Sequence, residues 1–329
     1  MKAATVHAMR RARLALVIAG AAAVSTPVIF AQQPRNAAPP SAAELHVLPV
    51  QGSVHMLVGA GANITLQIGK DGVLLVDTPA AALVPQVLAE IRKLSDKPLR
   101  YVIDTSLDAE HMGGNAALVG PAAGRGSGGA PFGTLGFNRP AIVAHENVLN
   151  RLSASQPPTP AAALPTTTYF QPSMDFSFNG EPVVILHAPR AHTDGDSIVW
   201  FRRSDVLAVG DLVRLDRYPD IDVARGGSVD GLITALDRIL EITVPERLQD
   251  GGTRVIVGHG RLCNEADIVE YRDMVAIVRD RVADLVKKGL TLDQVKTARP
   301  TRDYDTRYGP GEAMTEAVYR SLTEKRGPA

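Results

Sequence analysis

The sequence predicts an α/β protein, because short apolar runs of strand character alternate with longer segments of helical periodicity. Residues 69–72, Gly-Lys-Asp-Gly, separate two of the apolar runs and predict a β-hairpin turn. Residues 80–94 then place Leu83, Val87 and Ile91 on one face of a helix. Strands followed by a helix occur in the same order in the second half of the chain, which supports the α/β class.

Each expected element follows from such a local pattern. Residues 44–50 form the first expected strand, and because Pro49 cannot donate a backbone hydrogen bond, we expect this strand at a sheet edge. The other strands are expected within residues 54–58, 62–68, 73–77, 174–186, 197–208 and 254–257. Further helices are expected at residues 229–242, 265–288 and 311–325.

The N-terminal segment has the pattern of an export signal. Residues 10–13 are rich in arginine and precede an apolar run at residues 14–23, so we interpret residues 1–31 as a signal peptide. Residues 32–43 are polar and rich in proline and predict a disordered linker, which leaves residues 44–329 for the folded domain. We therefore expect a periplasmic or secreted protein, exported by the Sec or the twin-arginine route, with no membrane span after cleavage.

Composition limits the expected partners. The 329 residues include 35 basic and 35 acidic side chains, and this balance gives no reason to expect nucleic acid as a partner. With 45% hydrophobic residues the chain can bury a substantial core. The single cysteine, Cys263, excludes an internal disulfide, and we expect it to be a buried thiol. A small-molecule substrate is the expected partner, and the sequence leaves the oligomeric state open.

Potential metal ligands gather in one segment of the chain. Asp108, Glu110 and His111 lie within four residues, shortly after the apolar run at residues 101–103. A strand that runs into a short Gly-rich turn can bring these side chains to one side. Three more candidate ligands follow, each after an apolar run of strand character: His192, Asp211 and His259.

This arrangement resembles the metallo-β-lactamase superfamily, in which a signature His-X-His-X-Asp-His is followed by Gly-Gly-Asn. Ser106 stands at the position of the first histidine, Asp108 at that of the second, and Glu110 at that of the aspartate. His111 and the following Gly-Gly-Asn match the signature. The resemblance implies a four-layer αββα sandwich, in which two mixed β-sheets are flanked by helices.

The resemblance also implies two adjoining metal pockets. Carried over by position, the first pocket comprises Ser106, Asp108 and His192, the second comprises Glu110, His111 and His259, and Asp211 serves both. Because a serine hydroxyl is a poor zinc ligand, the first pocket is impaired and we expect one Zn²⁺ in the second, with two ions as the alternative.

Three functions are compatible with this ligand set. In the first, a metal-activated water attacks an amide, ester, lactone or β-lactam bond, and Asp108 orients the water or transfers a proton. In the second, the protein binds a small ligand without hydrolysis, because both leading histidines of the signature are absent. In the third, iron or manganese supports redox chemistry, since the carboxylates of Asp108 and Glu110 suit these metals.

Overall fold

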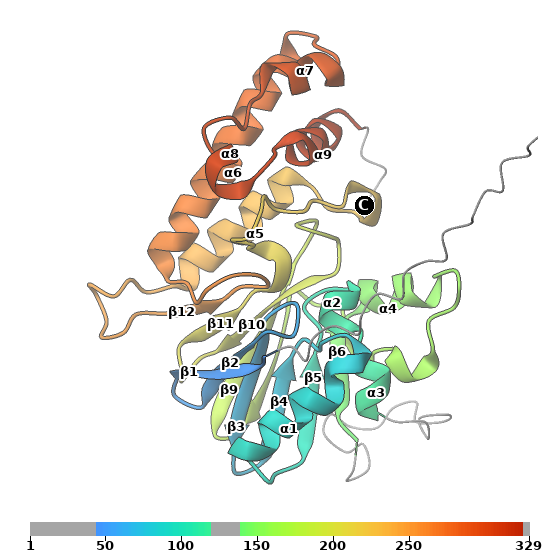
Figure 1. Cartoon of the computed structure of the whole chain (residues 1–329), viewed down its shortest axis with the longest axis vertical. Coiled ribbons are helices and arrows are strands. Elements are labelled where there is room, and N and C mark those ends of the chain that lie inside the picture. Colours follow the sequence, from blue (N-terminus) through green and yellow to red (C-terminus); the bar gives the residue numbers. More distant parts are fainter. Residues whose placement is uncertain (1–43, 120–138, 325–329) are drawn as a thin grey trace, which may run out of the picture. The chain divides into compact units, whose positions relative to one another are not determined.

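Two β-sheets lie face to face in the computed structural model, which describes residues 44–119 and 139–324 (Figure 1). The first sheet contains β1 (His46–Gln51), β2 (Val54–Val58), β3 (Ile64–Gly69), β4 (Gly72–Val76), β5 (Leu99–Ile103), β6 (Ala141–His145) and β7 (Thr167–Tyr169). The second contains β8 (Ser173–Phe178), β9 (Glu181–Ala188), β10 (Asp196–Phe201), β11 (Val206–Ala208) and β12 (Arg254–Ile256).

Both sheets are mixed. Strands β1 to β4 pair in antiparallel fashion, whereas β4 to β7 are parallel. In the second sheet β8 to β11 are antiparallel, and β11 and β12 are parallel. The expected hairpin is confirmed, because Gly69 pairs with Gly72. Strand β1, which contains Pro49, lies at the edge of its sheet as expected.

Helices and short 3₁₀ turns complete the fold. The helices are α1 (Val84–Leu94), α2 (Ala109–Met112), α3 (Asn115–Val119), α4 (Glu146–Ser153), α5 (Val229–Ile242), α6 (Glu265–Lys287), α7 (Leu292–Ala298), α8 (Asp305–Tyr308) and α9 (Glu312–Thr323). The 3₁₀ turns are η1 (Ala81–Leu83), η2 (Ala161–Ala163), η3 (Gly210–Leu212) and η4 (Val223–Arg225). The expected helix at residues 229–242 is confirmed with the same ends, and α6 ends one residue before the expected boundary.

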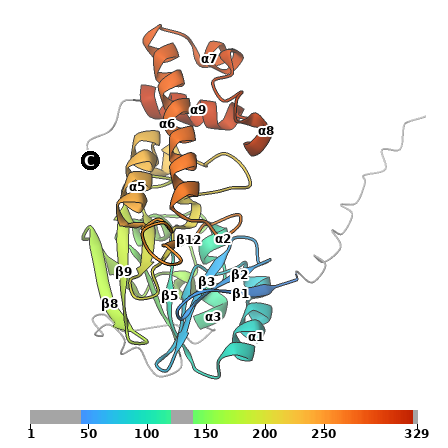
Figure 2. The same cartoon turned by 90° about the vertical axis from the view of Figure 1, so that its left-hand side faces the viewer.

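Along the strands, side chains alternate between the inner and the outer face of each sheet. Leu74 and Val76 of β4 are buried between the two sheets, whereas Val73 and Leu75 face outward against α1. In the second sheet, alternate residues of β9 and β10 likewise enter the space between the sheets, while their neighbours pack against α5 and α6. Helices thus cover the outer face of each sheet (Figure 2), and the expected αββα sandwich is confirmed.

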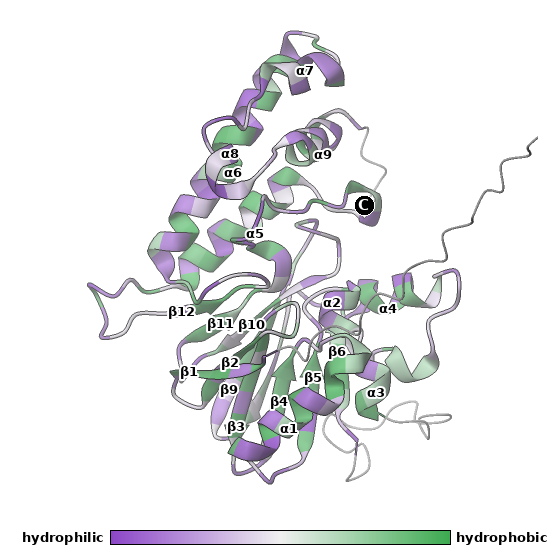
Figure 3. Ribbon diagram, viewed as in Figure 1, coloured by the Kyte–Doolittle hydropathy of each residue, from purple (hydrophilic) through white to green (hydrophobic). Residues whose placement is uncertain are grey.

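The C-terminal helices pack on α5 rather than on the sheets alone. Helix α6 begins with a capping box in which Asn264 and Asp267 bond to each other's backbone, and α9 packs against both α5 and α6. Figure 3 shows apolar residues concentrated on the strands, whereas α6 alternates apolar and hydrophilic residues. Among the described residues, no helix is both long and apolar enough to cross a membrane.

Several short elements were not anticipated from the sequence. They are α2, α3, α4, α7, α8, β6 and β7, most of which are too short for a periodic pattern to develop. The signal peptide and the linker expected at residues 1–31 and 32–43 lie outside the described residues, so both stay predictions.

Candidate metal centre

The candidate ligands come from four loops that follow strands. Asp108, Glu110 and His111 lie at the start of α2, beyond the carboxyl end of β5. His192 lies between β9 and β10, Asp211 lies in η3 after β11, and His259 follows β12. Because β11 and β12 are parallel neighbours, the loops that follow them meet at one edge of the second sheet.

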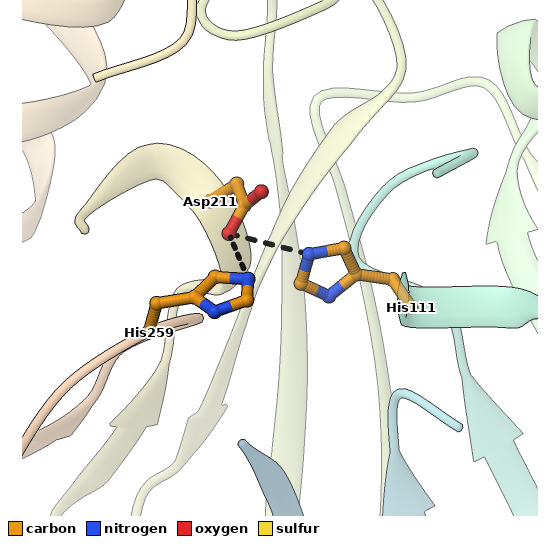
Figure 4. A group of neighbouring side chains, drawn as sticks. All are labelled: His111, Asp211 and His259. Atoms are coloured by element: carbon orange, nitrogen blue, oxygen red, sulfur yellow. Dashed lines mark ion pairs between the residues drawn. The ribbon is translucent and has the colours of Figure 1, made fainter. Parts of the chain in front are cut away.

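His111, Asp211 and His259 form one compact group. Oδ1 of Asp211 lies 3.3 Å from Nε2 of His111 and 3.6 Å from Nε2 of His259. Figure 4 shows the two imidazoles pointing toward this carboxylate from opposite sides. The three side chains each offer a ligand atom, and these atoms all lie within 4.8 Å of one another.

The ligand atoms of this group satisfy the requirements of a bound cation. Nε2 of His111, Nε2 of His259 and Oδ1 of Asp211 are buried, and none makes a well-aligned hydrogen bond to a described residue; their contacts are ion pairs with one another and, for His259, with Glu110. Buried polar atoms without partners are rare in folded proteins and often mark an ion site. Two imidazoles and a carboxylate also form a donor set that suits zinc. The residues present therefore fit a divalent metal.

Asp108, His192 and Asp211 form a second group. Their ligand atoms also lie within 4.8 Å of one another. Oδ2 of Asp108 lies 3.3 Å from Nε2 of His192. Both sets of three therefore share Asp211, as the two predicted pockets did.

A hydrogen-bond network orients His111. Oδ2 of Asp77 lies 2.8 Å from Nδ1 of His111 and also accepts a hydrogen bond from the hydroxyl of Thr105, while Oδ1 accepts one from the backbone N–H of Thr105. With a proton on Nδ1, the other ring nitrogen is free to bind a metal. Asp77 has a φ of 68°, a conformation that Asp and Asn tolerate better than most residues, so the end of β4 is shaped to present this carboxylate.

A shorter network supports His192. Oδ1 of Asp196 lies 3.5 Å from its Nδ1, and Asp196 is itself held by hydrogen bonds from the backbone N–H and the hydroxyl of Thr193. Asp196 therefore lies next to the imidazole of His192 and is fixed by Thr193. Asp194 instead accepts two hydrogen bonds from Arg151, and Ser197 bonds to the hydroxyl of Tyr169.

A model of the metallo-beta-lactamase superfamily matches residues 57–251, which contain most of these ligands. The chain belongs to this superfamily. Among known relatives, a linear primary-alkylsulfatase of Pseudomonas sp. (strain ATCC 19151) is 24% identical over 257 residues, which make up 68% of this chain and 47% of that protein. This chain therefore spans about half the length of the alkylsulfatase.

Solved structures show the same fold. The inverting sec-alkylsulfatase Pisa1 of Pseudomonas sp. superposes with a TM-score of 0.63 at 17% identity, over 85% of this chain and 50% of that one. A metallo-β-lactamase of Pontibacter korlensis superposes with a TM-score of 0.54 at 16% identity, over 71% of this chain and 99% of that one. The resemblance read from the sequence is thereby confirmed. Members of the superfamily typically bind divalent metals, which agrees with the two ligand groups.

The positions where this superfamily member departs from the signature have distinct surroundings. Ser106 is buried, and its hydroxyl accepts a hydrogen bond from the backbone N–H of Asp108 at 3.3 Å, which stabilises the turn before α2. Glu110 reaches His259, with Oε2 2.8 Å from Nε2, but its side chain is 56% exposed and lies outside the compact group of three. Glu110 therefore borders the group from the solvent side.

Two arginines that the sequence did not single out contact the ligands. Arg214 is buried and donates from Nη1 to Oδ2 of Asp211 at 3.0 Å. Arg225 donates from Nη1 to Oδ1 of Asp108 and from Nε to Oδ2 of Asp222. No sequence signal distinguishes these two from the other arginines, because their contacts depend on how distant loops pack.

Charge within the group shifts the pKa values of its members. Burial alone lowers the pKa of His111, but the carboxylates of Asp77 and Asp211 raise it well above its ordinary value. Burial raises the pKa of Asp211, yet His111 and Arg214 hold it below its usual range. Burial lowers the pKa of His259, and the charge of Arg214 adds to this effect. The carboxylates of Asp77 and Asp211 thus favour positive charge at this position.

His145, His187 and the single cysteine lie outside both groups. His145 is the residue before α4, accepts a hydrogen bond from the backbone N–H of Asn147, and stacks on His187 with 3.6 Å between ring centroids. His145 thus caps the start of α4. Cys263 is buried in the core beside α6, as expected, and burial raises the pKa of its thiol to about 12.

Proposed function

We propose that this protein is an exported, metal-dependent hydrolase that holds one zinc ion between His111, His259 and Asp211. The proposal rests on the convergence of three buried ligand atoms, none of which makes a well-aligned hydrogen bond to a described residue. Membership of the metallo-β-lactamase superfamily supports it. Export rests on the signal-like residues 1–31 alone.

The metal would supply a nucleophile. A bound zinc lowers the pKa of its water to about 7, so that hydroxide is available at neutral pH. The protein's own groups then orient the reactants. Asp77 keeps His111 in the tautomer that leaves Nε2 free, and Gly258 allows Asp211 to approach, since a Cβ at this position would lie 2.3 Å from Oδ1 of Asp211. Asp108, 3.3 Å from His192, is the group we assign to proton transfer.

A sulfate ester of an alkyl alcohol is the first substrate class to test. The names of the linear primary-alkylsulfatase and of the sec-alkylsulfatase support this choice, although each is about twice as long as the region they share with this chain. Carboxylic esters, lactones, amides and β-lactams complete the panel, because the same activated water can attack each of them.

Binding without hydrolysis is the second candidate, and one observation favours it. Ser106 is buried and its hydroxyl is engaged by the backbone of Asp108, so the pocket beside His192 has no third strong ligand of its own. Iron or manganese in place of zinc stays the third candidate, and the identity of the metal separates it from the first.

Metal analysis of the full chain tests the proposal. We would purify it without chelators or metal-affinity resin, count zinc, iron and manganese by mass spectrometry, and assay the substrate panel. We expect about one zinc per chain, as in catalytic sites with three protein ligands. His259→Ala should lose the metal and the activity, whereas His46→Ala, in which the replaced side chain is 54% exposed on β1, should keep both.

Each other outcome has a defined meaning. No metal after zinc, iron and manganese have each been added back would refute the hydrolase and leave a ligand-binding protein. Iron with redox activity would favour the third candidate. One zinc without turnover of any substrate in the panel would favour binding without hydrolysis.

A further inference from the structure

Arg225 lies where a second metal would compete for Asp108. Its Nη1 group contacts Oδ1 of Asp108, while Oδ2 of the same carboxylate faces Nε2 of His192 at 3.3 Å. A guanidinium is charged at every physiological pH and binds carboxylates strongly. Asp108, one of the three potential metal ligands in the group with His192, is thus already paired with a fixed positive charge.

The position of Arg225 is determined by several contacts. Its Nε donates to Oδ2 of Asp222 at 2.6 Å, and its backbone N–H donates to Oδ1 of the same residue at 2.8 Å. Its carbonyl accepts a hydrogen bond from the backbone N–H of Asp194 at 3.0 Å. The side chain is therefore anchored at both ends, and it is only 30% exposed.

The loop that carries Arg225 packs directly on the loop of His192. The backbone N–H of Asp222 donates to the carbonyl of His192 at 2.9 Å. A Cβ on Gly227 would lie 2.1 Å from that carbonyl, so only glycine permits this approach. Arg225 and His192 consequently belong to one rigid unit, and the guanidinium is held beside the imidazole.

The two ligand groups differ in what surrounds them. In the group with His192, Arg225 contacts Asp108; Arg214 contacts Asp211, which both groups share, so Arg214 does not distinguish them. In the group with His111 and His259, Oδ1 of Asp211 carries no hydrogen bond from any described residue, and the carboxylate of Glu110 adds negative charge 2.8 Å from His259. A cation is therefore favoured in the second of these groups and opposed in the first.

We infer that Arg225 takes the place of a second metal ion and limits the centre to one. This inference rests on the proposed metal-dependent function. It attributes the binding of only one metal ion to the charge of Arg225, and not to the missing signature histidines alone. Replacing Arg225 should therefore open the Asp108–His192–Asp211 group to a second ion without any new ligand being introduced.

A titration of the metal-free full chain with Co²⁺ and with Zn²⁺ tests the inference. We would count bound ions after desalting and follow the visible absorption of Co²⁺. We expect the parent to bind about one ion and Arg225→Met about two, the number that its two ligand groups can hold. Arg225→Lys keeps the positive charge and should bind as the parent does. Arg225→Gln provides the same test as Arg225→Met if the latter is insoluble.

Arg254→Met is the matched control. Arg254 is 29% exposed and forms an ion pair with Glu246. The variant therefore loses a comparable ion pair away from the ligands, and we expect it to bind one metal ion, as the parent does. One ion in both Arg225→Met and Arg225→Gln would overturn the inference and leave the proposed function unchanged. Two ions in the parent would also overturn the inference; a metal-dependent hydrolase would remain, but not one with a single zinc. A parent that binds no ion would overturn the proposed function and the inference together.

Discussion

Asp77→Asn tests whether the network behind His111 matters for metal binding. The buried Asp77 carboxylate meets Nδ1 of His111 at 2.8 Å and accepts two hydrogen bonds from Thr105 at 2.7 and 2.8 Å. Asparagine has the same shape and tolerates the φ of 68°, so the backbone need not change. The substitution removes the negative charge and places an amide where Nδ1–H needs an acceptor.

The expected loss of zinc affinity is 10- to 100-fold, or about 1.4 to 2.8 kcal/mol, the usual effect of changing a residue that orients a ligating histidine. The metal-free protein should also lose about 1 to 3 kcal/mol of stability, because one buried polar group is left unpaired. Competition with a chromogenic chelator gives the zinc Kd, and thermal unfolding gives the change in stability.

Asp104→Asn is the control for this experiment. Asp104 is also buried, follows the neighbouring strand β5, and accepts a hydrogen bond from the side chain of Asn115. Burial raises the pKa of Asp104 well above its ordinary range, so replacing it with a neutral amide costs less than replacing an exposed, ionised carboxylate. We expect an unchanged zinc Kd. If Asp77→Asn has the same zinc Kd as the parent and only its stability is reduced, the network is not needed to orient His111 for metal binding.

Three further predictions follow from the site and the core. Gly258→Ala should abolish zinc binding, because the new methyl would lie 2.3 Å from Oδ1 of Asp211 and 2.8 Å from the backbone carbonyl of Gly210; a retained ion, counted by mass spectrometry, would contradict this. The raised pKa of His111 means that its protonation stabilises the metal-free fold below the unfolded value of about 6.5, and that this stabilisation is lost as the pH rises through the folded pKa. The melting temperature of the metal-free protein should thus fall with rising pH while zinc affinity increases, and a melting profile that rises over this range would refute the assignment. Phe201→Ala should lower the free energy of unfolding by about 3 to 5 kcal/mol in denaturant titrations, whereas Phe170→Ala, at a side chain 66% exposed, should leave it nearly unchanged.

Much of the fold could be predicted because its causes are local. The alternation of inward and outward residues along β4 and the apolar face of α5 follow from side-chain spacing within one element. The Gly-Lys-Asp-Gly turn sets the register of its hairpin for the same reason. Short elements such as β7 and α2 were missed, since three or four residues hold too little pattern and depend on neighbours already in place.

The candidate ligands could also be read from the chain, since each follows an apolar strand in the order that the superfamily uses. The sequence alone therefore determined the α/β class, most of the strands in their order, and six candidate ligands, five of which the structure brings into the two groups. The tertiary structure decided which of these residues share a pocket and which charges oppose a metal there. Arg225 and Asp108 are 117 residues apart in the sequence, and their contact exists only because the loop that carries Arg225 packs on that of His192. No local pattern specifies such a contact, because the free energy that places it comes from the packing of the whole domain.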